Sequence, residues 1–135
     1  MHLRLVSLHI HPFDDGSILR AVRPYELCPE FDFSDVEVYS ITSEAPTPHG
    51  AHGHHERVEI FRATGGTVTC DFHTQEGCHK VVLDNPDVCV VVPSGVFHAV
   101  TIERGATLHV VASHRLREED HFFEINCVCG NHPKR

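Results

Sequence analysis

Turn-forming sequences recur at short, fairly regular intervals along this chain, and their spacing limits the fold more than any other feature. The turns are Asp14-Asp15-Gly16, Gly65-Gly66, Gln75-Glu76-Gly77, Asn85-Pro86-Asp87, Ser94-Gly95 and Glu103-Arg104-Gly105. Gly, Asn, Asp and Pro favour turns because they tolerate or preset the required backbone angles. The stretches between the turns are short and rich in Val, Ile and Phe, which favour strands. The pattern therefore predicts an all-β sandwich or barrel.

The predicted strands lie between these turns. They span residues 3–9, 17–22, 36–42, 52–63, 67–73, 80–83, 88–92, 96–102 and 107–112. Residues 24–34 contain two prolines among acidic and aromatic side chains and are predicted to form an ordered loop. Residues 115–125 are predicted to form a short helix or turn packed on the outside of the barrel.

The length of 135 residues, 41% of them hydrophobic, suits one domain spanning residues 1–135. A formal net charge of -8 argues against nucleic acid as a partner, because that binding needs many Lys and Arg side chains. The longest apolar stretches fall far short of the roughly 18 residues that a membrane-spanning helix needs, so no membrane partner is expected. The first residues lack the apolar core of a secretory signal, and a cytoplasmic location is expected.

The chain has six cysteines, which a reducing cytoplasm would keep as thiols. Two of them fall in the tail Cys127-Val128-Cys129-Gly130-Asn131-His132, which carries side chains that suit a soft metal. The tail is short, however, and the neighbouring sequence offers no fourth ligand. The metal signal in the tail is therefore weak.

The most informative segment is His49-Gly50-Ala51-His52-Gly53-His54-His55-Glu56-Arg57-Val58-Glu59. On a strand, residues two apart share a face, so His52 and His54 can point together into a barrel. Glu59 lies five residues beyond His54 and would face the other way on an unbroken strand. A bend or bulge near residues 56–58 must therefore turn it inward. Farther along, Pro93 and Gly95 supply a turn before the strand that bears His98.

Three imidazoles and a carboxylate that converge on one point form a site for a divalent first-row metal, with positions left open for a substrate. The predicted ligands are His52, His54, Glu59 and His98. These ligand types suit iron, manganese, nickel, zinc and copper alike, so the metal stays unnamed. Taken one at a time, the other histidines of this region and beyond are expected to bind nothing: His49, His55, His73, His79, His109, His114 and His121.

The order of these residues resembles the double motif of the cupins. That motif is H-x-H, four residues, E, six residues, G, and then P-x-G-x-x-H, and every position is filled here, from His52 through Gly66 to His98. The resemblance implies a cupin-type double-stranded β-helix, a jelly-roll barrel, with a short C-terminal helix or turn.

The chain also resembles a narrower cupin family, the nucleotide-sugar 3,4-ketoisomerases that act on dTDP-4-keto-6-deoxyglucose. The matching segments are Asp15-Gly16-Ser17-Ile18-Leu19, Val38-Tyr39-Ser40-Ile41, Gly50-Ala51-His52-Gly53-His54, Val92-Pro93-Ser94-Gly95-Val96-Phe97-His98, Val111-Ala112-Ser113 and Glu118-Glu119-Asp120-His121-Phe122. This resemblance implies an isomerase that moves a sugar ketone from C4 to C3 through an enediolate, with no organic cofactor and no metal. It implies His52 and His54 as catalytic acid and base and Tyr39 as a catalytic residue on the pocket wall.

Two positions depart from the ketoisomerase pattern. His49 stands where that family has an Arg, which removes a permanently charged phosphate partner. Glu59 stands where the family usually has Gln, which restores the anionic ligand of metal-binding cupins. The alternative function is therefore a metal-dependent cupin oxygenase, lyase or isomerase that uses the three histidines and Glu59 on another small oxygenated molecule.

The predicted partners are a small-molecule substrate, such as a nucleotide-linked keto sugar, and a second copy of the chain. An apolar strand from Leu3 to Leu8 would be a pairing hazard if left at a sheet edge, and homodimerisation would cover it. The ketoisomerase resemblance implies the same strand-exchanging dimer. Several inward-facing residues fit either the pocket wall or the ordinary core: Tyr39, Phe61, Phe72, Phe97 and His109.

Overall fold

A computed structural model describes residues 2–29 and 31–130. Almost all of its regular structure is β. The strands are β1 (Arg4–Ser7), β2 (His9–Pro12), β3 (Ile18–Ala21), β4 (Glu37–Thr42), β5 (Thr47–His54), β6 (Glu59–Thr64), β7 (Val68–His73), β8 (Cys78–Leu83), β9 (Val88–Val92), β10 (Phe97–Ile102), β11 (Thr107–Ala112) and β12 (His121–Phe122). The helices are a single turn, α1 (Pro24–Leu27), and a 3-10 turn, η1 (Glu118–Asp120). No helix of the described residues is long and apolar enough to span a membrane.

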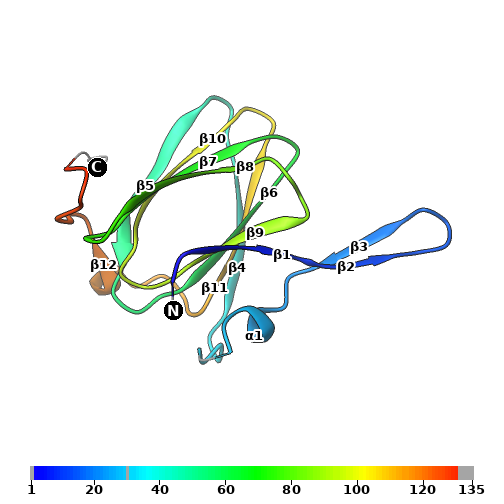
Figure 1. The fold of residues 1–135 in the computed structure, drawn as a ribbon, viewed down its shortest axis with the longest axis horizontal. Helices are drawn as coiled ribbons and strands as arrows, with labels where there is room; N and C mark the ends of the chain where they lie inside the picture. The colour runs from blue at the N-terminus through cyan, green and yellow to red at the C-terminus, as the bar shows by residue number, and fades with distance from the viewer. Residues whose placement is uncertain (1, 30, 131–135) are drawn as a thin grey trace.

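Two five-stranded antiparallel sheets form the body of the molecule (Figure 1). One sheet has the order β1-β9-β6-β11-β4, and the other has the order β12-β5-β10-β7-β8. Most neighbours in each sheet come from distant parts of the sequence, as when β10 lies between β5 and β7, whereas β7 and β8 form a hairpin. This topology confirms the predicted all-β jelly-roll fold.

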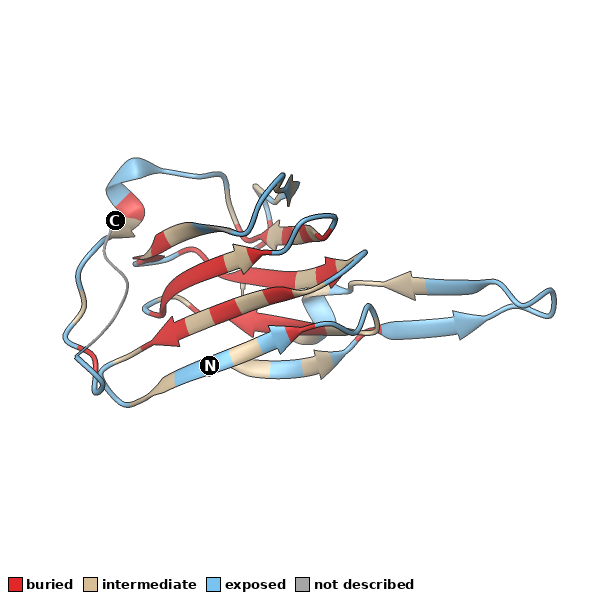
Figure 2. Ribbon diagram, turned by 90° about the horizontal axis from the view of Figure 1, so that it is seen from above, coloured by how far each residue is buried: buried red, intermediate tan, exposed pale blue. Residues whose placement is uncertain are grey.

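The core fills the space between the two sheets. Strand β11 alternates between half-buried and buried residues, so Leu108, Val110 and Ala112 point inward. Phe72 of β7 and Ile102 of β10 are fully buried from the opposite sheet. Figure 2 shows the buried positions concentrated on the facing strands of the body. Burial of these side chains, at roughly 25 cal/mol per Å² of apolar surface, is the main term that holds the sheets together.

Strands β2 and β3 pair only with each other in the described residues and form an arm that extends away from the body (Figures 1 and 2). Large apolar side chains remain exposed along this arm, among them Ile10, Phe13, Ile18 and Leu19. Strand β1 comes just before the arm and lies at the edge of its sheet, where it pairs with β9. The predicted strand 3–9 therefore ends at Ser7, and the chain then leaves the body.

Three other sequence-based predictions differ from the structure. Residues 52–63 do not form one strand, because the chain crosses from one sheet to the other at residues 55–58 and so makes β5 and β6. The predicted loop 24–34 begins with α1, since Pro24 occupies the first helical turn, where a missing N–H costs nothing. The segment 115–125 contains the predicted helical turn, η1, but it also contains the short strand β12, which pairs with β5 and was not predicted.

Candidate active site

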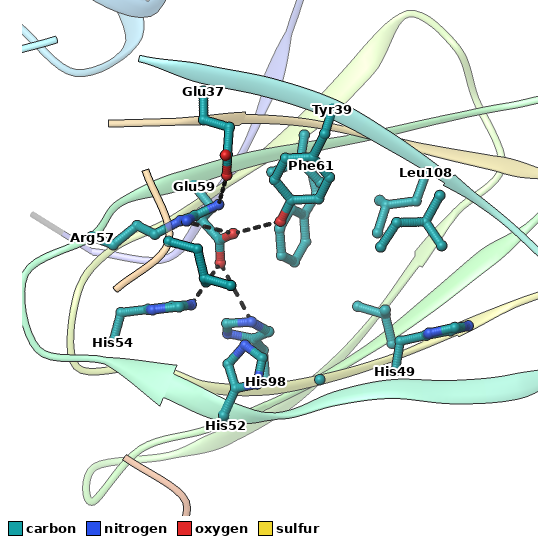
Figure 3. A pocket seen from close by; sticks show the side chains of 15 residues that line it. Glu37, Tyr39, His49, His52, His54, Arg57, Glu59, Phe61, His98 and Leu108 are labelled. Atoms are coloured by element: carbon teal, nitrogen blue, oxygen red, sulfur yellow. Dashed lines mark hydrogen bonds and ion pairs between the residues drawn. The ribbon is translucent and has the colours of Figure 1, made fainter. Parts of the chain in front are cut away.

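A cavity of about 350 Å³ opens between the two sheets. Its walls are partly apolar, with Phe61, Val100, Leu108 and Val110 among the lining residues. Most of the polar lining residues gather at one end, namely Glu37, Tyr39, His52, His54, Arg57, Glu59 and His98, whereas His49 lies toward the other end (Figure 3). A concave apolar pocket with a few convergent polar groups is the usual form of a small-molecule site.

Three imidazoles meet at the polar end of this cavity. His52 and His54 lie two residues apart on β5, as predicted, and His98 of β10 is the cross-strand partner of His52. The ring centroid of His52 lies 5.0 Å from that of His54 and 4.9 Å from that of His98. One ligand atom of each imidazole lies within 4.8 Å of the other two.

A β-bulge in β5 places a fourth histidine in the same cavity. The register between β10 and β5 shifts at His98, opposite Gly50 and Ala51, and both of these residues have positive φ angles of 86° and 60°. The bulge adds one residue to the count, so His49 and His52 line the cavity together although they are three apart. Sequence reasoning missed His49, although the glycine beside it is a typical signal of such a bulge.

Glu59 reaches the imidazoles from the other sheet. It is the first residue of β6, and its side chain is buried. One carboxylate oxygen, Oε1, lies 3.4 Å from Nε2 of His54 and 3.4 Å from Nε2 of His98 (Figure 3). The predicted inward turn before Glu59 is therefore present as the crossing between the sheets.

The other carboxylate oxygen of Glu59 is held by two neighbours. The hydroxyl of Tyr39 donates a hydrogen bond to Oε2 over 3.1 Å, and Nε of Arg57 lies 3.4 Å from the same oxygen. Arg57 is almost fully buried and also pairs with Glu37 at 3.2 Å. Its guanidinium lies over the ring of Tyr39, 5.7 Å from the centroid. Sequence reasoning missed Arg57, because it lies in the crossing between β5 and β6 and its partner Glu37 lies on a distant strand.

The C-terminal segment completes the surroundings of His54. Asp120 Oδ2 lies 3.7 Å from Nδ1 of His54 and 3.3 Å from Nε2 of His114. The carboxylate of Asp120 also accepts backbone hydrogen bonds from Glu56 and Arg57, over 2.8 Å and 3.2 Å. Asp120 thus fixes the crossing that follows β5 while it faces the histidine pair.

The imidazoles lie in an environment that disfavours their protonated form. Burial lowers the pKa of His52 to about 3, and the nearby His98, His54 and His121 act in the same direction. Burial also holds the pKa of His98 below its usual range. At neutral pH the ring nitrogens of His52 and His98 therefore retain lone pairs that can accept a proton or bind a metal.

The two oxygen-bearing groups beside the imidazoles differ in charge. Burial by itself would raise the pKa of Glu59, but the hydrogen bond from His54 and the positive charges nearby lower it to about 2. Burial raises the pKa of Tyr39 well above its usual value, and the charge of Glu59 adds to that effect. Glu59 is thus a carboxylate, and Tyr39 is a neutral hydroxyl that donates to it.

The predicted pocket residues divide into three groups. Tyr39 and Phe61 line the cavity. Phe72 belongs to the main core, and Phe97 packs in a smaller buried cluster with Ala51 and Ala99. His109 points to the outer side of β11, where Nε2 lies 2.8 Å from the hydroxyl oxygen of Thr64. The core alternative is therefore confirmed for Phe72 and Phe97, whereas His109 lies in neither the cavity wall nor the core.

The donor set fits a divalent metal. His52, His54 and His98 offer nitrogen atoms within one coordination sphere, and Glu59 directs Oε1 toward two of them. Arg57 and Tyr39 hold Oε2, which leaves Oε1 directed toward the imidazoles. Metal sites that keep a position for substrate typically combine imidazoles with one carboxylate and open into a cavity.

Comparison with known proteins gives one family match and many similar structures. The family model described as FdtA: WxcM-like, C-terminal matches residues 5–127. WlaRA, a TDP-fucose-3,4-ketoisomerase from Campylobacter jejuni, is 15% identical with a TM-score of 0.79, and the match covers 92% of this chain and 90% of that one. No curated protein matches the sequence at a significant level.

Two further structures have bound sugars. A mutant of the 3,4-ketoisomerase QdtA from Thermoanaerobacterium thermosaccharolyticum, in complex with TDP-4-keto-6-deoxyglucose, is 18% identical with a TM-score of 0.74 over 90% of this chain and 87% of that one. ChmJ, a 3'-monoepimerase from Streptomyces bikiniensis in complex with dTDP-quinovose, is 16% identical with a TM-score of 0.72 over 88% of this chain and 67% of that one. At identities of 15 to 18%, the TM-scores of 0.72 to 0.79 show a shared fold alone.

Proposed function

The chain belongs to the family described as FdtA: WxcM-like, C-terminal, and from this premise we propose that it is an isomerase that moves the ketone of a nucleotide-linked sugar from C4 to C3. The observation that carries the proposal is the group formed by His52, His54 and His98 at the polar end of the cavity. The names of WlaRA and QdtA support the same reaction class.

The reaction needs a base and an acid on adjacent sugar carbons. His52 is neutral at neutral pH, so its ring nitrogen is free to take the proton from C3, although its lowered pKa makes it a weaker base than an ordinary imidazole. Loss of this proton leaves an enediolate. His54 lies between the carboxylates of Glu59 and Asp120, so it is the imidazole best placed to carry the proton that goes to C4. The hydroxyl proton of O3 ends on O4, and a proton passes from His52 back to His54. Substrate and product then have the same atoms.

The groups around Glu59 position this pair. The bonds from Tyr39 and Arg57 fix the carboxylate, and the carboxylate orients His54 and His98. Positioned acid and base groups typically accelerate proton transfer by about 10² to 10⁴. If a metal is held by the three histidines and Glu59, it supplies Lewis-acid polarisation of the ketone oxygen.

The nucleotide would occupy the open part of the cavity. Of the described residues that line the cavity, only Arg57 carries a guanidinium, and it is paired with Glu37 and Glu59. His49 has a buried Nε2 atom that no described protein atom hydrogen-bonds. His49 is therefore the side chain that we propose for a polar group of the nucleotide sugar.

Incubation with TDP-4-keto-6-deoxyglucose in deuterated water tests the isomerase directly. We expect a 3-keto product with deuterium at C4, observed by nuclear magnetic resonance. His52→Ala and His54→Ala should each lose at least about 10²-fold in rate. His55→Ala is the matched control, because His55 is exposed next to this pair and should retain the rate. Deuterium at C3 with the ketone still at C4 would indicate an epimerase, and no change of the sugar would contradict the proposal.

The orientation of Glu59 favours a second candidate, a metal-dependent oxygenase, lyase or isomerase on another small oxygenated molecule. In that case the three histidines serve as ligands, and a nitrogen bound to a metal cannot accept a substrate proton at the same time. Metal analysis of protein purified without chelator or nickel resin separates the two. One metal per chain in this site without sugar turnover favours the second candidate, whereas turnover that survives chelation favours the metal-independent isomerase.

A further inference from the structure

A second cluster of metal-binding side chains lies outside the cavity, beside the turn between β7 and β8. It consists of His73, Cys78, Cys127 and Cys129, whose ligand atoms all lie within 4.8 Å of one another. Sγ of Cys129 lies 3.1 Å from Sγ of Cys78 and 3.4 Å from Sγ of Cys127. It also lies 3.4 Å from Nδ1 of His73. We propose that these four residues, the thiolate cluster, bind one zinc ion.

Two of the ligands come from a rigid hairpin. His73 ends β7 and Cys78 begins β8, and they are cross-strand partners. The turn between them is fixed by hydrogen bonds from the backbone N–H of Thr74 to the carbonyl of Gly77 and from the N–H of Gly77 to the hydroxyl of Thr74, over 2.8 Å and 2.9 Å. The hairpin therefore holds an imidazole and a sulfur at a set spacing before any ion binds.

The other two ligands come from the C-terminal tail. Cys127 and Cys129 lie in a turn closed by a hydrogen bond of 3.1 Å from the N–H of Gly130 to the carbonyl of Cys127. The sequence-based view that this tail has no further ligands nearby is wrong, because the fold brings the β7–β8 hairpin against it. His132, which also belongs to the tail motif, lies outside the described residues.

The donor set has the chemistry of a structural zinc site. Three Cys and one His are a common tetrahedral set, and zinc–sulfur bonds of about 2.3 Å place the sulfur atoms about 3.8 Å apart. The sulfur distances of 3.1 Å and 3.4 Å need a small outward shift to reach that value. His73 and Cys127 are buried, whereas Cys129 is exposed, so an ion can enter from the side of Cys129. Four protein ligands leave no open position, which distinguishes this site from the histidines of the cavity.

The bound zinc would anchor the segment that covers the catalytic histidines. Strand β12 pairs with β5, and the ring of His121 lies 4.7 Å from the rings of both His52 and His54. Two ligands of the thiolate cluster, Cys127 and Cys129, lie a few residues farther along the same segment. Zinc would therefore tie the far end of this segment to the β7–β8 hairpin and keep β12 in place.

Cobalt provides the most direct test, because it reports the ligand type. Protein stripped of metal under reducing conditions is titrated with Co²⁺, and we expect an intense thiolate-to-cobalt absorption band that saturates at one ion per chain. The cavity site has no sulfur ligand, so it cannot give this band. The double variant His52→Ala/His98→Ala should keep the band unchanged.

Substitution of the exposed ligand tests the assignment within the thiolate cluster. Cys129→Ser should weaken zinc binding by at least about 10-fold and diminish the cobalt band. His79→Ala is the matched control, because His79 is an exposed histidine next to Cys78 that is not in the cluster, and it should bind zinc like the unaltered chain. In the His52→Ala/His98→Ala background, which removes the cavity ligands, chelation should lower the melting temperature and speed hydrogen exchange in residues 121–130, and both effects should be smaller when Cys129→Ser is added.

Two results would overturn the proposal. One is the absence of a thiolate-to-cobalt band in the reduced, unaltered chain. The other is a band that persists at full strength in both Cys129→Ser and Cys127→Ser. A Cys78–Cys129 disulfide in protein isolated with blocked thiols, with no cobalt band after reduction, would assign the cluster to disulfide formation in place of zinc.

Discussion

His98 and His52 are cross-strand partners on β10 and β5, and their ring centroids lie 4.9 Å apart. Because the pairing fixes both backbones, the two imidazoles are held together by the sheet itself and do not depend on a mobile loop. His54 extends the same face of β5. A site built on strands has a more constant geometry than one built on loops, which suits the proposed proton transfer between two adjacent sugar carbons.

The substitution Glu59→Gln tests the carboxylate as a metal ligand. We expect the affinity of the cavity site for a metal to fall by at least about 10-fold, because the neutral amide no longer offsets the charge of the ion. The measurement is the metal content of Glu59→Gln/Cys129→Ser compared with Cys129→Ser alone, so that the weakened thiolate cluster contributes equally to both. Glu37→Gln is the control, since Glu37 contacts Arg57 from the other side. Unchanged metal content in Glu59→Gln would rule out the carboxylate as a ligand.

The substitution Asp120→Asn tests the carboxylate that fixes the crossing between the sheets. One of the backbone N–H groups of Glu56 and Arg57 would lose its acceptor, at a cost of about 1 to 3 kcal/mol. Denaturant unfolding at neutral pH measures this loss, and the exposed Glu119→Gln should unfold like the unaltered chain.

The same substitution has a predicted pH dependence. Although burial would raise the pKa of Asp120, the hydrogen bonds from Arg57 and Glu56 lower it, with His114 and His54 facing the same carboxylate. A lowered folded-state pKa stabilises the fold above the unfolded value of about 4 and stops doing so as the pH falls through the folded value. The difference in unfolding free energy between Asp120→Asn and the unaltered chain should therefore shrink below about pH 4. A difference that stays constant down to pH 2 would contradict the assigned role.

The substitution Gly53→Ala tests the contact between β5 and β12. A Cβ atom at this position would lie 2.2 Å from Cζ of Phe122, so the aromatic ring must leave its place. We expect a loss of about 1 to 3 kcal/mol in unfolding free energy. The double variant Gly53→Ala/Phe122→Ala removes the clash, so it should cost less than the two single changes added together. Simple additivity in this double-mutant cycle would show that the contact is absent in solution.

The exposed arm of β2 and β3 leads us to expect a homodimer. Its apolar side chains, Ile10 and Leu19 among them, lie on a hairpin that extends from the body next to the edge strand β1. Light scattering should give twice the chain mass of 15.1 kDa. The double variant Ile10→Asp/Leu19→Asp should be a monomer, whereas Val82→Asp, at an exposed apolar position on β8, an edge strand of the other sheet, should remain a dimer. A monomeric unaltered chain would refute the expectation.

The substitution His49→Arg tests whether the cavity accepts a nucleotide. A guanidinium at this position could make a bidentate contact with phosphate, and charge-assisted hydrogen bonds of about 1.5 to 3 kcal/mol correspond to roughly 10- to 100-fold in affinity. Calorimetry with TDP should show this gain, while the exposed control His79→Arg should show none. If His49→Arg does not bind TDP more tightly, the phosphates lie elsewhere.

The alternation of turns and β-formers was sufficient to predict the sheets. It failed at residues 52–63, because the pattern of apolar residues does not reveal where a chain passes from one sheet to the other. It also failed to predict α1, since a single helical turn has too few residues for a recognisable period. The resemblance to cupins gave the jelly-roll class, but the order of the strands, such as β10 between β5 and β7, was not predicted, because turn spacing does not say which strands pair.

The spacing of His52, His54, Glu59 and His98 predicted which side chains meet. Arg57 and Asp120 could not be assigned in the same way, because a buried charge is recognised only from its partners, and those come from distant strands. The thiolate cluster is a similar case. Cys78 is separated from Cys129 by 51 residues, and only the packing of the tail on the β7–β8 hairpin brings the sulfur atoms together.

Glu59 belongs to one sheet and the histidines to the other, so the distance between carboxylate and imidazoles is set by the thickness of the protein interior. Interiors pack like crystals and resist compression, which keeps this gap constant. Substitutions that change side-chain volume between the two sheets, even far from the cavity, should then alter this distance and with it the reactivity of the site.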